Sequence, residues 1–245
     1  MILKKSDYQH RKDAILGIVI NEYIKTITPV SSGYIAQGYL VDLSSATIRN
    51  ILAELEQEGY LTHPHTSAGR IPTQDGYRYY VDHLMHEIQF LGEEKEKIKQ
   101  EYEKSVRDLE AILEKTSEMI SGVTQYTSII SVDGRKDRIF CRGTEHVVAY
   151  HPSFDINKIR EILSTLEKKE QILEVINRDL RQKIQIYIGH EIACSAIEEC
   201  SLAISQFKID SGLSGRIAVL GPTRMDYQKV VSTLDYFSQV IKEIL

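Results

Sequence analysis

The sequence is poor in cysteine, and its three cysteines, Cys141, Cys194 and Cys200, form no close pair. A disulfide framework needs an even and denser set, and structural zinc sites usually contain ligands two to four residues apart. A zinc site made of Cys194, Cys200 and a histidine such as His190 can be drawn, but it lacks such a pair. The composition therefore favours reduced thiols in a core and predicts no metal site.

Long apolar runs are also absent. No stretch approaches the roughly 18 to 20 apolar residues that a membrane helix needs. The N-terminal residues MILKKSD contain two lysines, but no apolar segment or cleavage site of a secretory signal follows them. We therefore expect a cytoplasmic protein with no membrane partner.

The motifs of common enzymes are missing as well. The chain contains no GxSxG, no P-loop, no GxGxxG after a strand and no HExxH. Scattered serine, histidine and aspartate residues are expected in any chain of this length. An enzyme is therefore the weakest functional class, and we predict no catalytic residues and no cofactor.

An excess of positive charge is the fourth absence. The formal net charge is -5, and the first ninety residues hold eight lysines and arginines against ten aspartates and glutamates. Proteins that bind nucleic acids usually have a basic face. Any argument for DNA binding must therefore rest on local pattern and not on bulk charge.

The N-terminal pattern predicts three helices. Apolar residues recur at helical spacing from Asp7 to Lys25, and Ser31 or Ser32 can cap a short second helix. The third helix begins at the serine cap Ser44 and ends at Gly59. Its predicted inward face is Ile48, Ile51, Leu52 and Leu55, and its other face is Ser45, Thr47, Arg49, Asn50 and Ala53.

That outer face suits the major groove of DNA. Arginine can bind guanine through two hydrogen bonds, and asparagine can bind adenine in the same way. Two short strands then flank the small-residue segment from His65 to Gly69, with Arg70 placed where a wing would meet phosphate or the minor groove. An ordinary solvated helix face remains the alternative for Arg49 and Asn50 taken alone.

The rest of the chain alternates between helical and strand patterns. An apolar seam from Ile98 to Val123 can pair with a second copy of the chain or fold back on the C-terminal half. Beyond it, strand and helix patterns alternate around an Asp133-Gly134 turn and predict an α+β domain. Thr223 and Asp226 match a capping box that opens the last helix, although a bound anion there stays an alternative.

Several contiguous runs resemble the family of the heat-inducible transcription repressor HrcA. They are SATIRN at 45–50, LEQEGYL at 55–61, PHTSAGRIPT at 64–73 and GYRYYVD at 76–82. A further run, GPTRMDY at 221–227, lies near the C-terminus.

The resemblance implies a winged helix-turn-helix joined to a GAF-like domain. It also implies a homodimer that binds double-stranded DNA at an inverted-repeat operator upstream of chaperone operons, and dependence on the chaperonin. We expect the winged helix-turn-helix at residues 1–87, a helical linker and dimerisation seam at 88–123, and the GAF-like domain at 124–245. The DNA-binding residues would be Ser44, Ser45, Thr47, Arg49, Asn50, His65, Thr66, Ser67, Gly69 and Arg70.

The chain departs from the family pattern in two places. Ser31 stands where members commonly have glycine, and there is room for only a hairpin between Ser131 and Gly143, where the family carries an inserted dimerisation segment. The seam from Ile98 to Val123 then becomes the natural dimer interface. An alternative function is a winged-helix regulator gated by a small molecule bound to the GAF-like domain, although this rests on fold analogy alone.

Overall fold

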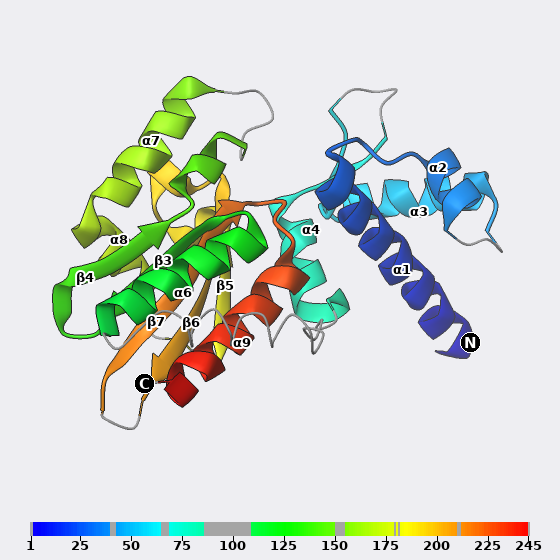
Figure 1. The fold of residues 1–245 in the computed structure, drawn as a ribbon. Helices are drawn as coiled ribbons and strands as arrows, with labels where there is room; N and C mark the ends of the chain where they lie inside the picture. The colour runs from blue at the N-terminus through cyan, green and yellow to red at the C-terminus, as the bar shows by residue number, and fades with distance from the viewer. Residues whose placement is uncertain are drawn as a thin grey trace. The chain divides into compact units, whose positions relative to one another are not determined.

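The computed structural model describes residues 2–39, 43–64, 69–85, 109–149, 155–178, 180, 182–209 and 212–244. The chain forms two compact units, residues 1–86 and 87–245 (Figure 1). Buried apolar side chains occur in both units, so each has a core of its own. Within the described ranges, no helix combines the length and apolar composition needed to cross a membrane.

Helices and one short antiparallel ribbon make up the described part of the N-terminal unit. The helices pack together through apolar side chains such as Leu16 and Val19, both 0% exposed. In chain order the elements are α1 (Ile2–Thr26), α2 (Ser32–Gly38), α3 (Ser45–Gln57), β1 (Leu61–Thr62), β2 (Ile71–Pro72), α4 (Gln74–Tyr79) and the π-helical turn η1 (Tyr80–Leu84).

Hydroxyl side chains begin three of these helices, as the sequence predicts. The Ser31, Ser44 and Thr73 side chains accept hydrogen bonds from the amides three residues ahead, at 3.2, 3.1 and 3.0 Å. After α3, Gly59 has a φ of +83°, a conformation that residues with a side chain rarely adopt. The predicted ends of this helix are therefore confirmed.

A five-stranded antiparallel sheet organises the second unit. Its strand order is β4-β3-β7-β6-β5, so strands far apart in the sequence lie side by side. The strands are β3 (Thr127–Val132), β4 (Arg135–Arg142), β5 (Ile184–Ile188), β6 (Cys200–Lys208) and β7 (Ser214–Pro222). The structure is thus a mixture of helices and antiparallel sheet, as the sequence predicts.

Helices cover both faces of this sheet (Figure 1). α6 (Leu109–Thr124) and α9 (Tyr227–Ile244) pack together on one face, where hydroxyl pairs such as Ser205–Ser238 join sheet to helix at 2.8 Å. The other face holds a larger apolar cluster that includes Ile129 and Leu202. Its covering elements are η2 (Thr144–Ala149), α7 (Ile156–Glu167), α8 (Lys169–Ile176), η3 (Gly189–Ile192) and η4 (Ser195–Ile197).

The described part of the predicted apolar seam is helix α6. Leu113, Thr116 and Ile120 are each 0% exposed, and α6 contacts β3, β4 and α9 of its own unit. This part of the seam folds back on the C-terminal half and leaves those three residues no surface for a second copy. The earlier part of the seam, including Ile98, lies outside the described residues.

Two local predictions in this unit have different outcomes. The Asp133-Gly134 turn is confirmed, because Gly134 has a φ of +73° and joins paired strands β3 and β4. The predicted cap of the last helix is wrong by one turn. Asp226, and not Thr223, accepts the hydrogen bond from the Lys229 amide at 3.0 Å.

Candidate nucleic-acid interface

Helix α3 separates an apolar side from a polar side. Ile48, Ile51, Leu52 and Leu55 are buried, as predicted from their spacing. Ser44, Ala46, Arg49 and Asn50 are exposed. Because the inner side is packed, the orientation of the outer side is fixed, and Arg49 and Asn50 are presented at defined positions on a rigid element.

Two other predicted residues of this helix contact hydroxyl side chains of the protein. The Ser45 hydroxyl lies 3.3 Å from the Ser32 hydroxyl of α2, so it joins the two helices. The Thr47 hydroxyl lies 2.9 Å from the Ser44 hydroxyl and belongs to the cap. Both are only half-exposed, whereas Ala46, which was not among the predicted residues, is open to solvent.

Acidic residues are confined to the second half of α3. The stretch from Ser44 to Ala53 has none, whereas Glu54, Glu56 and Glu58 follow it. Lys12 of α1, only 6% exposed, forms an ion pair with Glu58 and lies 3.9 Å from Glu54. These carboxylates are thus partly neutralised within the unit, and the N-terminal half keeps the positive charge of Arg49.

A buried carboxylate joins α1 to α2. Glu22, 6% exposed, accepts hydrogen bonds from the hydroxyls of Tyr34, at 2.6 Å, and of Tyr39. The tyrosine hydrogen bonds, first that of Tyr34, lower the pKa of Glu22 because they stabilise its ionised form. The same interaction raises the pKa of Tyr39 to about 12. Glu22 therefore holds α2, the partner of α3, in place.

The base of the two-stranded ribbon is fastened to the segment before α2. Val30 and Arg70 exchange backbone hydrogen bonds of 2.9 and 2.8 Å. A Cβ atom at Gly69 would lie 2.5 Å from the Val30 carbonyl carbon, so this close approach requires glycine. Gly69 thus has a structural role at the point where the ribbon leaves the protein.

The side chain of Arg70 is directed to helix α3. Its Nη2 lies 2.7 Å from Glu56 Oε2, while His63 Nδ1 contacts Glu56 Oε1. The predicted residues His65, Thr66 and Ser67 lie outside the described residues. The role of Glu56 as the partner of His63 and Arg70 is not visible in the sequence, because these residues are seven and fourteen positions away and meet Glu56 only in the folded unit.

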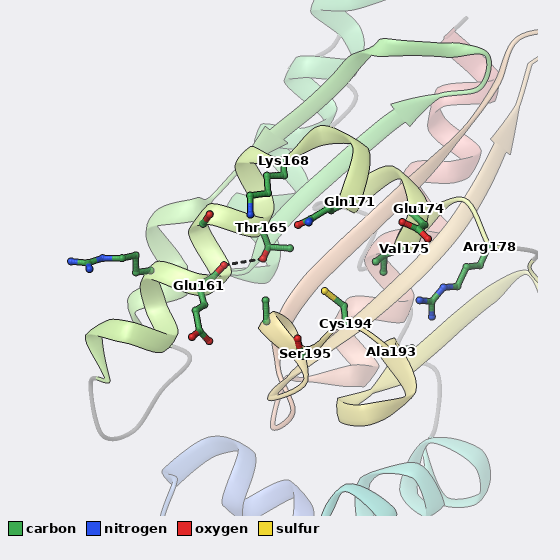
Figure 2. Close-up of a pocket in the computed structure, with 13 residues that line it drawn as sticks. Glu161, Thr165, Lys168, Gln171, Glu174, Val175, Arg178, Ala193, Cys194 and Ser195 are labelled. Carbon is green, nitrogen blue, oxygen red and sulfur yellow. Dashed lines mark hydrogen bonds between the residues drawn. The ribbon is translucent and has the colours of Figure 1, made fainter.

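A pocket of about 540 Å³ opens on the C-terminal unit between α7, α8 and the loop from η3 to η4. Figure 2 shows Lys168, Thr165 and Gln171 on one side and Cys194 and Ser195 on the other, with the sulfur directed into the space between them. Its charged lining residues are Arg160, Glu161, Lys168, Glu174 and Arg178. Such a mixed lining suits a small polar molecule.

The described cysteines are free thiols. Burial raises the pKa of Cys141 to about 11 and that of Cys200 to about 12, so both are protonated at neutral pH and are weak nucleophiles and metal ligands. Among the described residues, no group of three histidine, cysteine or acidic side chains is arranged to hold a metal ion.

Comparison with known proteins identifies the family. The family described as "HrcA protein C terminal domain" matches residues 91–231, more than half of the chain. The chain belongs to the HrcA family. Relatives named "Heat-inducible transcription repressor HrcA" match along nearly the whole length: that of Pelotomaculum thermopropionicum is 27% identical, covering 96% of each chain, and that of Acetivibrio thermocellus is 29% identical, covering 95% of each.

This HrcA protein is shorter than those relatives. The alignment with the Pelotomaculum protein has 334 positions, whereas the chain has 245 residues, so the relative has residues with no counterpart here. A solved structure described as that of a hypothetical protein shares the fold, with a TM-score of 0.73 and 18% identity over 96% of each chain.

Proposed function

We propose that this HrcA protein is a transcription repressor of heat-shock operons, and that α2, α3 and the β1–β2 ribbon act as a winged helix-turn-helix on double-stranded DNA. The observation that carries the proposal is the orientation of α3. Its inner side is buried, and Arg49 and Asn50 are exposed in a stretch without acidic residues. Membership of a family whose relatives are named heat-inducible repressors supports the same function.

In this proposal α3 is the recognition helix. Arg49 pairs with guanine and Asn50 with adenine, each through two hydrogen bonds in the major groove. The first-turn amides of α3 that the Ser44 side chain does not cap would suit a backbone phosphate. Residues 65–67, at the tip of the wing, would meet the adjacent backbone or minor groove.

We further propose that the repressor binds its inverted repeat as a homodimer. With a net negative charge, one N-terminal unit has few cations to neutralise phosphates, so useful affinity requires two copies on one operator. The described part of the predicted seam is packed inside its own unit, which leaves residues 88–108 or another surface of the C-terminal, GAF-like unit as the interface. Dependence on the chaperonin is proposed from the family resemblance alone.

Footprinting on the promoters of chaperone operons tests the function. Purified full-length protein at moderate salt should protect an inverted repeat, with one dimer per repeat. Sedimentation of the same sample with labelled operator DNA measures that stoichiometry. A folded protein that protects no inverted repeat, with or without added chaperonin, would refute the proposal.

A second candidate function is gating by a small molecule. The pocket between α7 and α8 favours it, because its volume of about 540 Å³ falls in the range of ligand sites and its walls carry several polar groups. A thermal-shift screen against nucleotides and metabolites tests this function. Stabilisation by one ligand class, lost in a Gln171→Ala variant, would support gating, whereas a flat screen would refute it.

A further inference from the structure

Glu56 lies on the same side of α3 as Arg49, about two helical turns further on. An isolated carboxylate there would repel the phosphates of any DNA that lies along this side of the helix. In this protein both of its oxygens are engaged: Oε1 by His63 and Oε2 by Arg70, the latter at 2.7 Å. The interaction therefore neutralises an acidic group at the end of the proposed recognition surface.

The same carboxylate connects three elements. Glu56 belongs to α3, His63 follows strand β1, and Arg70 precedes strand β2. The backbone of Arg70 is at the same time bonded to Val30, ahead of α2. Both ends of the ribbon are thus tied to the recognition helix, and one of them is tied to the start of the helix-turn-helix as well.

The environment of Arg70 differs from that of a phosphate-binding arginine on a surface. Its side chain is only 22% exposed, and one terminal nitrogen is occupied by Glu56. Its Nε is buried and has no hydrogen-bond partner in the described part of the chain. Glu56 therefore orients this guanidinium and already occupies one of its donor nitrogens.

We propose that Glu56 is a positioning residue that clamps the base of the wing to the recognition helix, and that Arg70 acts on DNA through this clamp without touching a phosphate. This inference rests on the proposed operator binding. It explains how the wing and the recognition helix are held at a fixed separation. It replaces the direct contact that the sequence suggests for Arg70.

A double-mutant cycle on operator binding tests the clamp. We expect Glu56→Gln and the double variant to weaken binding by the same factor, about tenfold, because loss of the carboxylate already breaks the interaction. Arg70→Gln should bind more weakly still, since it leaves the Glu56 carboxylate without its arginine. The double variant, which removes one charge of each sign, should keep the salt dependence of the wild type. Gln57→Ala, a change at an exposed neighbour of Glu56, is the matched control and should bind normally. Circular dichroism confirms that each variant is folded.

Two results would overturn the clamp. If the double variant binds more weakly than Glu56→Gln, and if its log affinity falls less steeply with log salt than that of the wild type, by about 0.9, Arg70 contacts a phosphate directly. If Glu56→Gln binds the operator as well as the wild type does, Glu56 positions nothing.

Hydrogen exchange on the free protein gives a readout that does not need DNA. The amides of Val30 and Arg70, which are bonded across the base of the wing, should exchange several-fold faster in Glu56→Gln and at the wild-type rate in Gln57→Ala. Unchanged exchange in Glu56→Gln would overturn the clamp even if the wild type binds its operator. Faster exchange in a protein whose wild type binds no operator would refute the proposed function and not the clamp.

Discussion

The two halves of helix α3 use their polar residues in opposite ways. The first half, from Ser45 to about Leu52, exposes Arg49 and Asn50 and contains no acid. The second half contains Glu54 and Glu56 and is followed by the capping residue Glu58. Each of these three contacts a cation or a tyrosine elsewhere in the unit. One half is thus available to an external partner, while the other is committed to the protein.

On the proposed function, this difference explains how a negatively charged unit can still offer a surface to DNA. The net charge counts every charged group equally. It includes groups whose charge a neighbour already neutralises, such as Glu58 with Lys12, and groups that face solvent, such as Arg49. A polyanion at close range interacts mainly with the nearby solvent-facing groups, since charges beyond about 10 Å are screened at moderate salt. The distribution of charge along α3 is therefore more informative than its sum.

The same chemical change in each half should have very different effects. Asn50→Asp places a carboxylate in the acid-free half, removes a hydrogen-bond donor and adds repulsion to phosphates. We expect a loss larger than the roughly 1 to 3 kcal/mol of one two-bond base contact, measured as operator affinity by electrophoretic mobility shift.

Gln57→Glu is the matched variant in the other half. It also converts an exposed amide into a carboxylate, and we expect its operator affinity to change by less than about threefold, because the new charge lies about two helical turns from Asn50 and removes no base contact. Equal losses in the two variants would show that the halves do not differ in their relation to DNA.

Removing the cation of the first half should have the next largest effect. Arg49→Ala should weaken operator binding by about 1 to 3 kcal/mol and relax the base preference at one position of each half-site. Arg49→Lys is the control, since it keeps the charge but cannot donate two parallel hydrogen bonds. A selection from randomised operators measures both effects. Unchanged base preference in Arg49→Ala would place another residue in the groove.

Removing Lys12 of α1, the cation that pairs with the second half of α3, should affect stability instead of recognition. Lys12→Met leaves Glu54 and Glu58 without their shared partner, so we expect the free energy of unfolding to fall by about 1 to 2 kcal/mol. This figure is below that for a fully buried pair because the two glutamates are nearly half exposed. Urea unfolding followed by circular dichroism measures it. The operator affinity of the folded variant should equal that of the wild type. A specific loss of affinity would contradict the different roles of the two halves of α3.

The smallest expected effect concerns pH. The pKa of Tyr39 is raised to about 12, from about 10 in an unfolded chain, by its bond to Glu22. This bond stabilises the folded unit fully below pH 10 and is lost as the pH rises toward 12. Spectrophotometric titration should show a tyrosine that ionises at a lower pH in Glu22→Gln than in the wild type. A titration curve identical to that of the wild type would show that Glu22 does not hold the α2 tyrosines.

At acid pH the dependence of stability on pH has the opposite direction. Since its two tyrosine bonds lower the pKa of Glu22, their contribution is present above the ordinary glutamate pKa and is lost as the pH falls through the lowered value.

Much of the fold follows from local sequence signals. The cap Ser44, the inner side of α3 and the Asp133-Gly134 turn depend on residues within a few positions of each other, and the structure confirms them. Arg49 and Asn50 are exposed for the same reason: helical period alone separates them from Ile48 and Ile51.

The parts that sequence analysis did not find depend on distant residues. Glu56 meets Arg70, and Glu22 meets Tyr34, only after the helices pack. The sequence does not determine what α6 packs against, for a similar reason. An apolar stripe has the same pattern whether it packs against a sheet or against a second chain. The last cap was misplaced by three residues because Thr223 and Asp226 are equally good cap residues by type.

The bond between Val30 and Arg70, with Gly69 pressed against the same segment, has a practical consequence for protein design. The described anchor consists of Val30, Gly69 and Arg70, so a library that varies residues 65–68 leaves all three unchanged. On the proposed function, such variants would keep this attachment and differ in the residues offered to DNA. A repressor with a new preference for flanking bases could thus be selected from a library of four positions.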